Sequence, residues 1–142
     1  MAFTGNFACN VFRTGLMNGT FNFTSGTFYM ALYTNDATLG PTTPAYTTEG
    51  EVVASGYTAG GLALTITQAP TVGPTPSTTA YISFANAEWT GEITARGALI
   101  YQSGGDNPAV CVLDFGSNKT STSTFTVQFP AATDTSAIIR IA

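Results

Sequence analysis

The stretch Thr122-Ser123-Thr124-Phe125-Thr126-Val127-Gln128-Phe129 decides the fold class. From Thr124 onward, hydroxyl and amide side chains alternate with phenylalanine and valine. Successive side chains of a β-strand point to opposite faces of the sheet, so this alternation predicts a strand with one buried and one exposed face. The run Thr79-Ala80-Tyr81-Ile82-Ser83-Phe84 mixes β-branched, aromatic and hydroxyl residues in a similar way. The sequence therefore predicts half-buried strands packed on a core.

Short runs of the same character recur along the chain, between segments rich in glycine and proline. Glycine adopts positive φ in turns without steric cost, and proline is excluded from the middle of a sheet. Seven or eight short strands with regular turn signals predict a single all-β domain over residues 1–142, with an antiparallel β-sandwich or barrel-like architecture. The expected strands are residues 27–34, 52–54, 62–67, 80–84, 93–101, 109–114, 122–129 and 137–141, and the expected loops and turns are residues 35–51, 56–61, 70–77, 104–108 and 116–118.

An N-terminal segment, residues 1–26, precedes the predicted β-sandwich of residues 27–142 and carries the best helix signal. Val11 and Phe12 follow Phe7 by four and five residues, and Leu16 follows Phe12 by four residues. This spacing places apolar side chains on one face of a helix. The pair Asn18-Gly19 is a typical stop signal. We expect a short helix over residues 7–18.

The charge of the chain is unusually low. Charged residues make up 8% of the sequence, histidine is absent, and the net charge is −4. Without histidine, catalysis by a Ser-His-Asp or Cys-His arrangement is excluded in its usual form. Nucleic-acid binding normally needs clustered positive charge, so we expect no nucleic-acid partner. The four basic residues are scattered along the chain: Arg13, Arg96, Lys119 and Arg140.

Hydropathy and the N-terminal sequence indicate where the protein resides. No apolar stretch approaches the ~20 residues of a membrane span, so we expect no membrane partner. Residues 1–6 lack the basic and apolar regions of a signal peptide. We expect a protein made in a cytoplasm. A surface with so little charge, combined with many strand edges, favours contact between copies, and we expect a homo-oligomer.

The residues that bind metals or perform acid–base catalysis are sparse. Two cysteines without histidine make a zinc site implausible, and no EF-hand sequence is present, so we expect no metal or cofactor. Cys111 lies in an apolar run and is expected to be buried; whether Cys9 pairs with it, or with another chain, is left open.

Glu88 and Glu92 flank Trp89 and are the one carboxylate pair considered for a glycosidase, but two solvated acids in a turn are favoured. Glu51 is expected at the surface. We expect no enzyme.

Arg96 is the most informative charged residue. It lies in the otherwise apolar run Ile93-Thr94-Ala95-Arg96-Gly97-Ala98-Leu99-Ile100-Tyr101. A cation on such a strand faces solvent or pairs with a carboxylate. We expect an ion pair with Asp114, formed within the chain or across a subunit boundary.

The chain resembles a family of small structural proteins of tailed bacteriophages. The resemblance covers nearly the whole chain and implies a virion component, but its motifs carry no catalytic signature. It is carried by Ile93-Thr94-Ala95-Arg96-Gly97-Ala98-Leu99-Ile100-Tyr101, by Asn107-Pro108-Ala109-Val110-Cys111-Val112-Leu113-Asp114-Phe115-Gly116-Ser117 and by Lys119-Thr120-Ser121, with further likeness in residues 1–7, 28–38 and 137–141.

The resemblance implies a component of the virion, in the head or the tail. Our first hypothesis is a non-enzymatic protein that decorates or cements the phage head and binds the major capsid protein or other virion proteins. An aromatic-rich N-terminal segment is a plausible anchor on such a partner. The alternative is a short helix that caps the protein's own core. The expected docking residues are Phe3, Phe7, Val11, Phe12 and Leu16.

A second hypothesis is a tail or fibre module that binds a glycan on the host surface. Such a module presents exposed aromatic rings to sugars. The candidates are Trp89, Tyr46 and Tyr57, which the hypothesis places on exposed loops.

Overall fold

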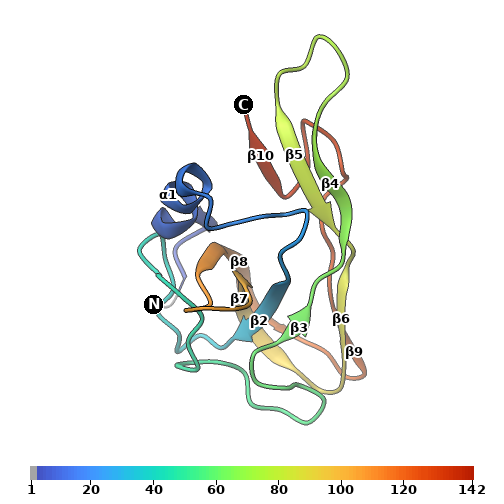
Figure 1. Cartoon of the computed structure of the whole chain (residues 1–142). Coiled ribbons are helices and arrows are strands. Elements are labelled where there is room, and N and C mark those ends of the chain that lie inside the picture. The colour runs from blue at the N-terminus through green and yellow to red at the C-terminus, as the bar shows by residue number, and fades with distance from the viewer. Residues whose placement is uncertain (1–2) are drawn as a thin grey trace.

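The computed structural model describes residues 3–142 and is built mainly of β-strands with one short helix (Figure 1). All strand pairs over these residues are antiparallel. The predicted fold class, an all-β sandwich with a short N-terminal helix, is confirmed. The elements are β1 (Phe7–Ala8), α1 (Asn10–Asn18), β2 (Phe28–Tyr33), β3 (Leu62–Ala63), β4 (Ile66–Val72), β5 (Ala80–Phe84), β6 (Ala87–Thr90), β7 (Thr94–Gln102), β8 (Ala109–Thr120), β9 (Thr124–Val127) and β10 (Ile139–Ile141).

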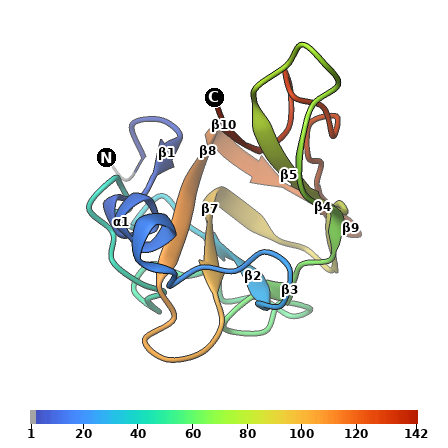
Figure 2. The same cartoon turned by 45° about the horizontal axis from the view of Figure 1, so that its top comes forward.

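The strands form three sheets. The largest has the order β1-β8-β7-β2-β3, a second has the order β10-β5-β4, and the third pairs β6 with β9. The β4–β5 hairpin and the C-terminal strand β10 stand to one side of the large sheet, and α1 lies near β1 and β8 on the other side of the view (Figure 2).

Two of these sheets share one continuous ribbon. Thr90 pairs with Thr124 in the β6–β9 pair, and Thr94 pairs with Thr120 in the β7–β8 pair. Four residues separate the two pairs on each side of the ribbon, so the antiparallel register is unchanged between them. The ribbon therefore bends at residues 91–93 and 121–123 and passes from the large sheet into the small one without slipping.

Ser121 holds this bend together. Its hydroxyl donates to the Gly91 carbonyl at 2.7 Å and accepts the Ile93 N–H at 3.1 Å. The backbone N–H of Gly91 donates to Ser123 O, and that of Ser121 donates to Ile93 O, both at 2.8 Å. One small side chain thus satisfies the backbone groups that the bend releases from the regular ladder.

A bulge interrupts the β7–β8 pair next to the bend. Gly97 pairs with Asp114 and Ala95 pairs with Lys119, so Arg96 alone lies opposite residues 115–118 of β8. Gly116 takes a φ of 83° within this excursion, a conformation that glycine adopts without strain. The predicted turn at residues 116–118 is therefore a bulge, and the strand expected to end at Asp114 continues to Thr120.

The core is continuous between the sheets and the N-terminal segment. Phe23 stacks on Phe28 with ring centroids 4.4 Å apart, and both contact Phe84 of β5. Phe12 of α1 meets Phe21 and Phe23 edge to face. Aromatic contacts thus tie the helix, the large sheet and the β4–β5 hairpin to one core.

Three predicted boundaries are wrong for identifiable reasons. The helix begins at Asn10 because Phe7 pairs with Val112 of β8, and Cys9 is still extended. Residues 62–67 contribute to two strands in different sheets, β3 and β4. The expected strand at residues 52–54 is absent, and Glu51 instead forms an isolated bridge with Tyr33.

Two other segments were expected to be loops or turns and are strands. Pro70 lies in β4, an edge strand whose register shifts between Gln68 and Thr71. A proline at an edge or a bulge removes no necessary ladder hydrogen bond. Glu88 and Trp89 lie in β6, where the burial alternates along the strand.

Candidate functional site

The predicted docking segment is divided between the core and the surface. Phe3 and Phe12 are 1% and 4% exposed, so they belong to the protein's own core. Phe7, Val11 and Leu16 are half-buried. Of the expected docking residues, these three alone leave part of the side chain open to solvent.

A groove runs between α1 and β10. Two adjoining cavities, of about 280 and 610 Å³, are both lined by Phe12, Leu16, Ile139 and Ile141. We call these the α1–β10 groove. Side chains from the helix and from the C-terminal strand thus face one apolar depression, because β10 pairs only with β5 and leaves its other edge toward the helix side. The further lining residues include Phe21, Phe23, Tyr81 and Ile82 in the smaller cavity and Phe7, Arg13, Leu113 and Arg140 in the larger one.

The charge of the α1–β10 groove is positive. Arg13 and Arg140 line its larger cavity, whose lining includes no acidic residue. Arg13 donates to the Ala8 carbonyl at 2.7 Å and Arg140 donates to the Thr135 carbonyl at 2.8 Å. Both guanidinium groups thus bond to neutral oxygens, and neither forms an ion pair within residues 3–142. The groove combines an apolar floor with half of the basic residues of the chain.

One exposed apolar side chain lies in the groove, and another lies on α1 outside its lining. Ile141 at its edge is 53% exposed, and Met17 at the end of α1 is 84% exposed. Exposed apolar groups next to an apolar depression are typical of a protein–protein contact surface.

The structure brings Arg96 and Asp114 together as an ion pair within one chain. Their side chains are 11% and 13% exposed. Burial acts to raise the pKa of Asp114, but the Gly116 N–H and the Arg96 guanidinium outweigh it and hold that pKa below its ordinary value. The Arg96 guanidinium also lies 5.6 Å from the centre of the Phe3 ring. Arg96 thus joins the N-terminal segment to the bulge of β8.

The aromatic residues proposed for glycan binding do not form an exposed platform. Trp89 and Tyr57 are 5% and 9% exposed, and Tyr46 is half-buried. Trp89 lies on the buried face of β6, with its ring 6.2 Å from Tyr57 and 6.3 Å from Phe125. The alternation along β6 turns this tryptophan inward, where it fills the core.

Glu51 is the residue that sequence reasoning placed wrongly. It was expected at the surface and is 8% exposed. Its two carboxylate oxygens accept hydrogen bonds from the hydroxyls of Tyr46 and Tyr57, both at 2.7 Å, and from the Gly60 N–H at 2.8 Å. The only ion pair among residues 3–142 is Arg96–Asp114, so neutral donors stabilise this carboxylate. The tyrosines on either side of it in the sequence, Tyr46 and Tyr57, were the available signal that a buried acid had partners.

The tyrosines around Glu51 are held in their neutral form. Burial, followed by the hydrogen bond to Glu51, raises the pKa of Tyr57 and of Tyr46. Burial and the negative charge of Glu51 raise the pKa of Tyr33 and bring that of Tyr101 to about 12. Tyr101 donates to the Gly60 carbonyl at 2.6 Å. The network pins the loop that precedes β3 to the large sheet.

Other candidate groups are placed as follows. Glu88 and Glu92 are exposed and do not face a shared buried site. Cys9 and Cys111 are both buried free thiols, and burial raises their pKa values to about 11 and about 12.

Within the described residues, no three His, Cys, Asp or Glu side chains gather in a way that suits a metal ion. No helix among them has the length and hydropathy to cross a membrane.

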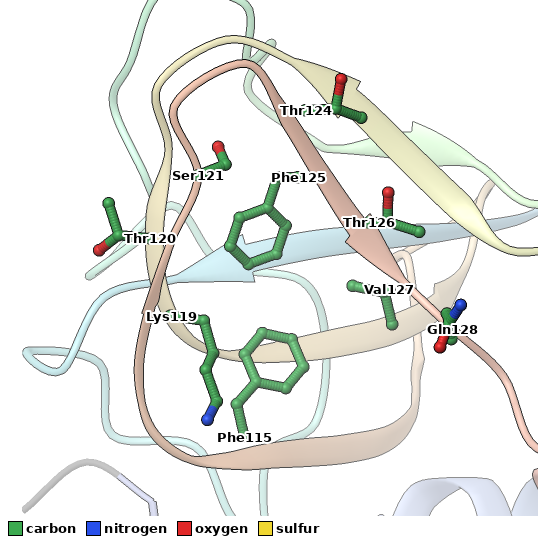
Figure 3. Close-up of a pocket in the computed structure, with 9 residues that line it drawn as sticks. All are labelled: Phe115, Lys119, Thr120, Ser121, Thr124, Phe125, Thr126, Val127 and Gln128. Carbon is green, nitrogen blue, oxygen red and sulfur yellow. The ribbon is translucent and has the colours of Figure 1, made fainter.

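A second concave site lies at the bend of the ribbon (Figure 3). It has a volume of about 560 Å³ and lies between the bulge of β8 and strand β9. We call it the corner pocket; its lining residues are Phe115, Lys119, Thr120, Ser121, Thr124, Phe125, Thr126, Val127 and Gln128. Sequence reasoning missed this pocket because it depends on the bulge and the bend, and the alternation pattern reveals neither.

Comparison of the chain with protein-family models, with curated proteins and with solved structures found no match.

Proposed function

We propose that this chain is a non-enzymatic structural protein of a tailed-phage virion that decorates the head and docks on the major capsid protein through the α1–β10 groove. The family resemblance of residues 93–101 and 107–117 supports the virion assignment. The groove is the observation that carries the docking assignment, because it combines an apolar floor, two arginines and the exposed side chain of Ile141.

The mechanism is stabilisation of the lattice by mass action. A protein that binds only the assembled lattice shifts the assembly equilibrium toward it. Covering Leu16 and Ile141 removes apolar surface from water, and each Å² of such surface contributes about 25 cal/mol. Arg13 and Arg140 add selectivity for a partner surface that carries acidic groups.

The rigidity of the fold suits this role. Ser121 fixes the bend of the ribbon, and Arg96 fixes the bulge next to it. A rigid module loses little conformational entropy when it docks, so more of the contact energy appears as affinity.

The chemistry of the acids supports a role without catalysis. The buried carboxylate, Glu51, has both oxygens occupied by tyrosine hydroxyls. Trp89 and Tyr57 lack the exposed ring faces on which the glycan-binding alternative depends. Neither feature favours a second function.

Binding to heads that lack this protein tests the proposal. Purified protein is mixed with such heads and the bound fraction is measured by co-sedimentation. The variant Ile141→Asp places a charge at the edge of the groove, and Val53→Asp places the same charge at a 97% exposed site outside the residues that line it. Both sites are solvent-exposed, so both variants are expected to fold, which circular dichroism checks.

We expect wild type and Val53→Asp to bind alike, and Ile141→Asp to bind at least about tenfold more weakly, a difference of about 1.4 kcal/mol. Equal binding of all three would remove the groove from the proposal. Failure of wild type to bind heads would overturn the decoration role itself.

A further inference from the structure

The corner pocket is bounded by the end of β8 and by β9, which the bend at residues 121–123 turns toward each other. Figure 3 shows the rings of Phe115 and Phe125 within the angle between β8 and β9, with the Lys119 side chain beside Phe115. The two ring centroids lie 6.2 Å apart. Phe115 is half-buried and Lys119 is exposed, so the pocket has an aromatic interior and a cationic rim.

One edge of β9 faces this pocket with unpaired backbone groups. In an antiparallel pair, only every second residue bonds to the partner strand. The bonds of Gly91 to Ser123 and of Ser121 to Ile93 set the phase of the ribbon. With the register unchanged, the backbone N–H and C=O groups of Phe125 bond to β6. Those of Thr124 and Thr126 point to the opposite edge of β9, which pairs with no strand of residues 3–142.

This edge carries neither a proline nor a bulge that would block strand pairing. Natural edge strands carry proline, inward-pointing charge or a bulge, as β4 does with Pro70 and its register shifts. Strand β9 reads Thr124-Phe125-Thr126-Val127 and pairs with β6 in unbroken register. An open strand edge beside a pocket is the arrangement by which folded domains bind extended peptides.

The charge at the pocket selects the peptide. Lys119 is the only basic residue among those that line the pocket, and none of them is acidic. The single ion pair of residues 3–142 does not involve it. A carboxylate on the bound segment would therefore meet an uncompensated cation.

We propose that the open edge of β9 binds an extended acidic segment of a partner protein by β-strand addition. Thr124 and Thr126 supply the backbone hydrogen bonds, the rings of Phe115 and Phe125 receive an aromatic or aliphatic side chain, and Lys119 pairs with an aspartate or glutamate. No residue is shared between this pocket and the α1–β10 groove. This site is therefore a second docking surface, and it does not depend on the head-decoration role.

The probes are blocked seven-residue peptides of alternating threonine and valine with a central phenylalanine. An aspartate stands two positions from the phenylalanine, on the same face of an extended strand. A matched peptide carries asparagine in place of the aspartate. Each is titrated into the full ¹⁵N-labelled chain, and the backbone amide resonances of Thr124 and Thr126 are followed.

Three variants identify the contacts. Thr126→Pro removes an N–H that points away from β6, so it blocks strand addition while leaving the ladder intact. Lys119→Gln removes the charge at the pocket, and Arg140→Gln removes a charge in the α1–β10 groove as the control. Because Lys119 is exposed, its variant tests the proposal even if Thr126→Pro does not fold.

We expect the aspartate peptide to shift both threonine amides and to bind about three- to fivefold more tightly than the asparagine peptide, as an exposed ion pair allows. Lys119→Gln abolishes that preference, Thr126→Pro abolishes binding, and Arg140→Gln changes neither. Absence of shifts at β9 at millimolar peptide would overturn the proposal. So would a preference that survives Lys119→Gln. Shifts that depend on protein concentration alone would show that a second copy of the chain occupies the edge, and would overturn the assignment to a partner protein.

Discussion

Arg96 stands alone opposite four residues of β8, and its ion pair with Asp114 closes the start of that excursion. Asp114 also accepts the Gly116 N–H at 2.8 Å, and its own N–H donates to the Asn6 side chain at 2.6 Å. The pair therefore sets the point at which β8 leaves β7. Phe115 directly follows Asp114, so the ion pair also fixes the position of Phe115 in the corner pocket.

Arg96→Ala should destabilise the fold by about 1–2 kcal/mol, because it leaves a largely buried carboxylate without its cation. Urea unfolding monitored by fluorescence measures this. Lys119→Ala, which removes an exposed basic residue at the other end of the same excursion, should change the free energy of unfolding by less than about 0.5 kcal/mol. Equal effects of the two substitutions would contradict the structural role of Arg96.

The same ion pair has a defined pH dependence. The pKa of Asp114 is lower in the folded chain than its ordinary value. Its contribution to stability is therefore present above that ordinary value, about 3.9, and is lost as the pH falls through the folded pKa. The difference in unfolding free energy between wild type and Arg96→Ala should shrink below about pH 4. A difference that stays constant down to pH 2 would show that packing of Arg96, and not its charge, causes the effect.

Ser121→Ala should cost about 1–2 kcal/mol, because the Ile93 N–H and the Gly91 carbonyl at the bend would lose their partner. Ser123→Ala is the matched control: it lies in the same bend, its side chain is exposed, and only its backbone carbonyl bonds to Gly91. This control should stay within about 0.5 kcal/mol of wild type. Thermal unfolding compares the two, and a Ser121→Ala variant as stable as Ser123→Ala would show that the hydroxyl does not hold the bend.

Glu51→Ala should cost about 3 kcal/mol, because two tyrosine hydroxyls and the Gly60 N–H would lose their acceptor in the interior. Glu51→Gln keeps one acceptor oxygen and the side-chain volume, and should cost about 1 kcal/mol. The order of the two variants in urea unfolding is the decisive result. If the glutamine variant is the less stable of the two, the negative charge matters more than the hydrogen bonds.

Alkaline pH should unfold the protein through its buried tyrosines. The pKa values of Tyr33, Tyr46, Tyr57 and Tyr101 are all raised in the folded chain. Above about pH 10 the unfolded chain loses these protons and the folded chain keeps them, so stability falls with up to about 1.4 kcal/mol per pH unit for each tyrosine. Absorbance of tyrosinate followed against pH should rise together with the loss of circular dichroism. Ionisation of all six tyrosines with the fold intact would contradict the buried network.

The strands were predictable and their partners were not. Alternation from Thr124 to Phe129 correctly identified β9, because it reports which side chains are buried. It carries no information on pairing, so the continuation of one ribbon through the bend at Ser121 was not visible in the sequence. In a threonine-rich segment, the sequence does not distinguish an exposed serine such as Ser123 from one such as Ser121, whose hydroxyl bonds to the backbone at the bend.

The candidate site shows the same limit. The pairing of Arg96 with Asp114 followed from a lone cation on an apolar strand, which has few ways to be satisfied. The burial of Glu51 was missed because its donors, Tyr46 and Tyr57, come from a glycine- and threonine-rich loop that reads as surface. The α1–β10 groove arises from residues more than 100 positions apart, and no local pattern places Leu16 beside Ile141.

Whether phage particles carry this protein, and on which part, tests the central claim most directly. Gold-labelled antibody against this chain is applied to intact particles, and the label is mapped by electron microscopy. Our account predicts label distributed over the head, with none on the tail. Label confined to the tail or its tip, or particles that carry no label while a head-protein antibody labels them, would contradict the decoration role.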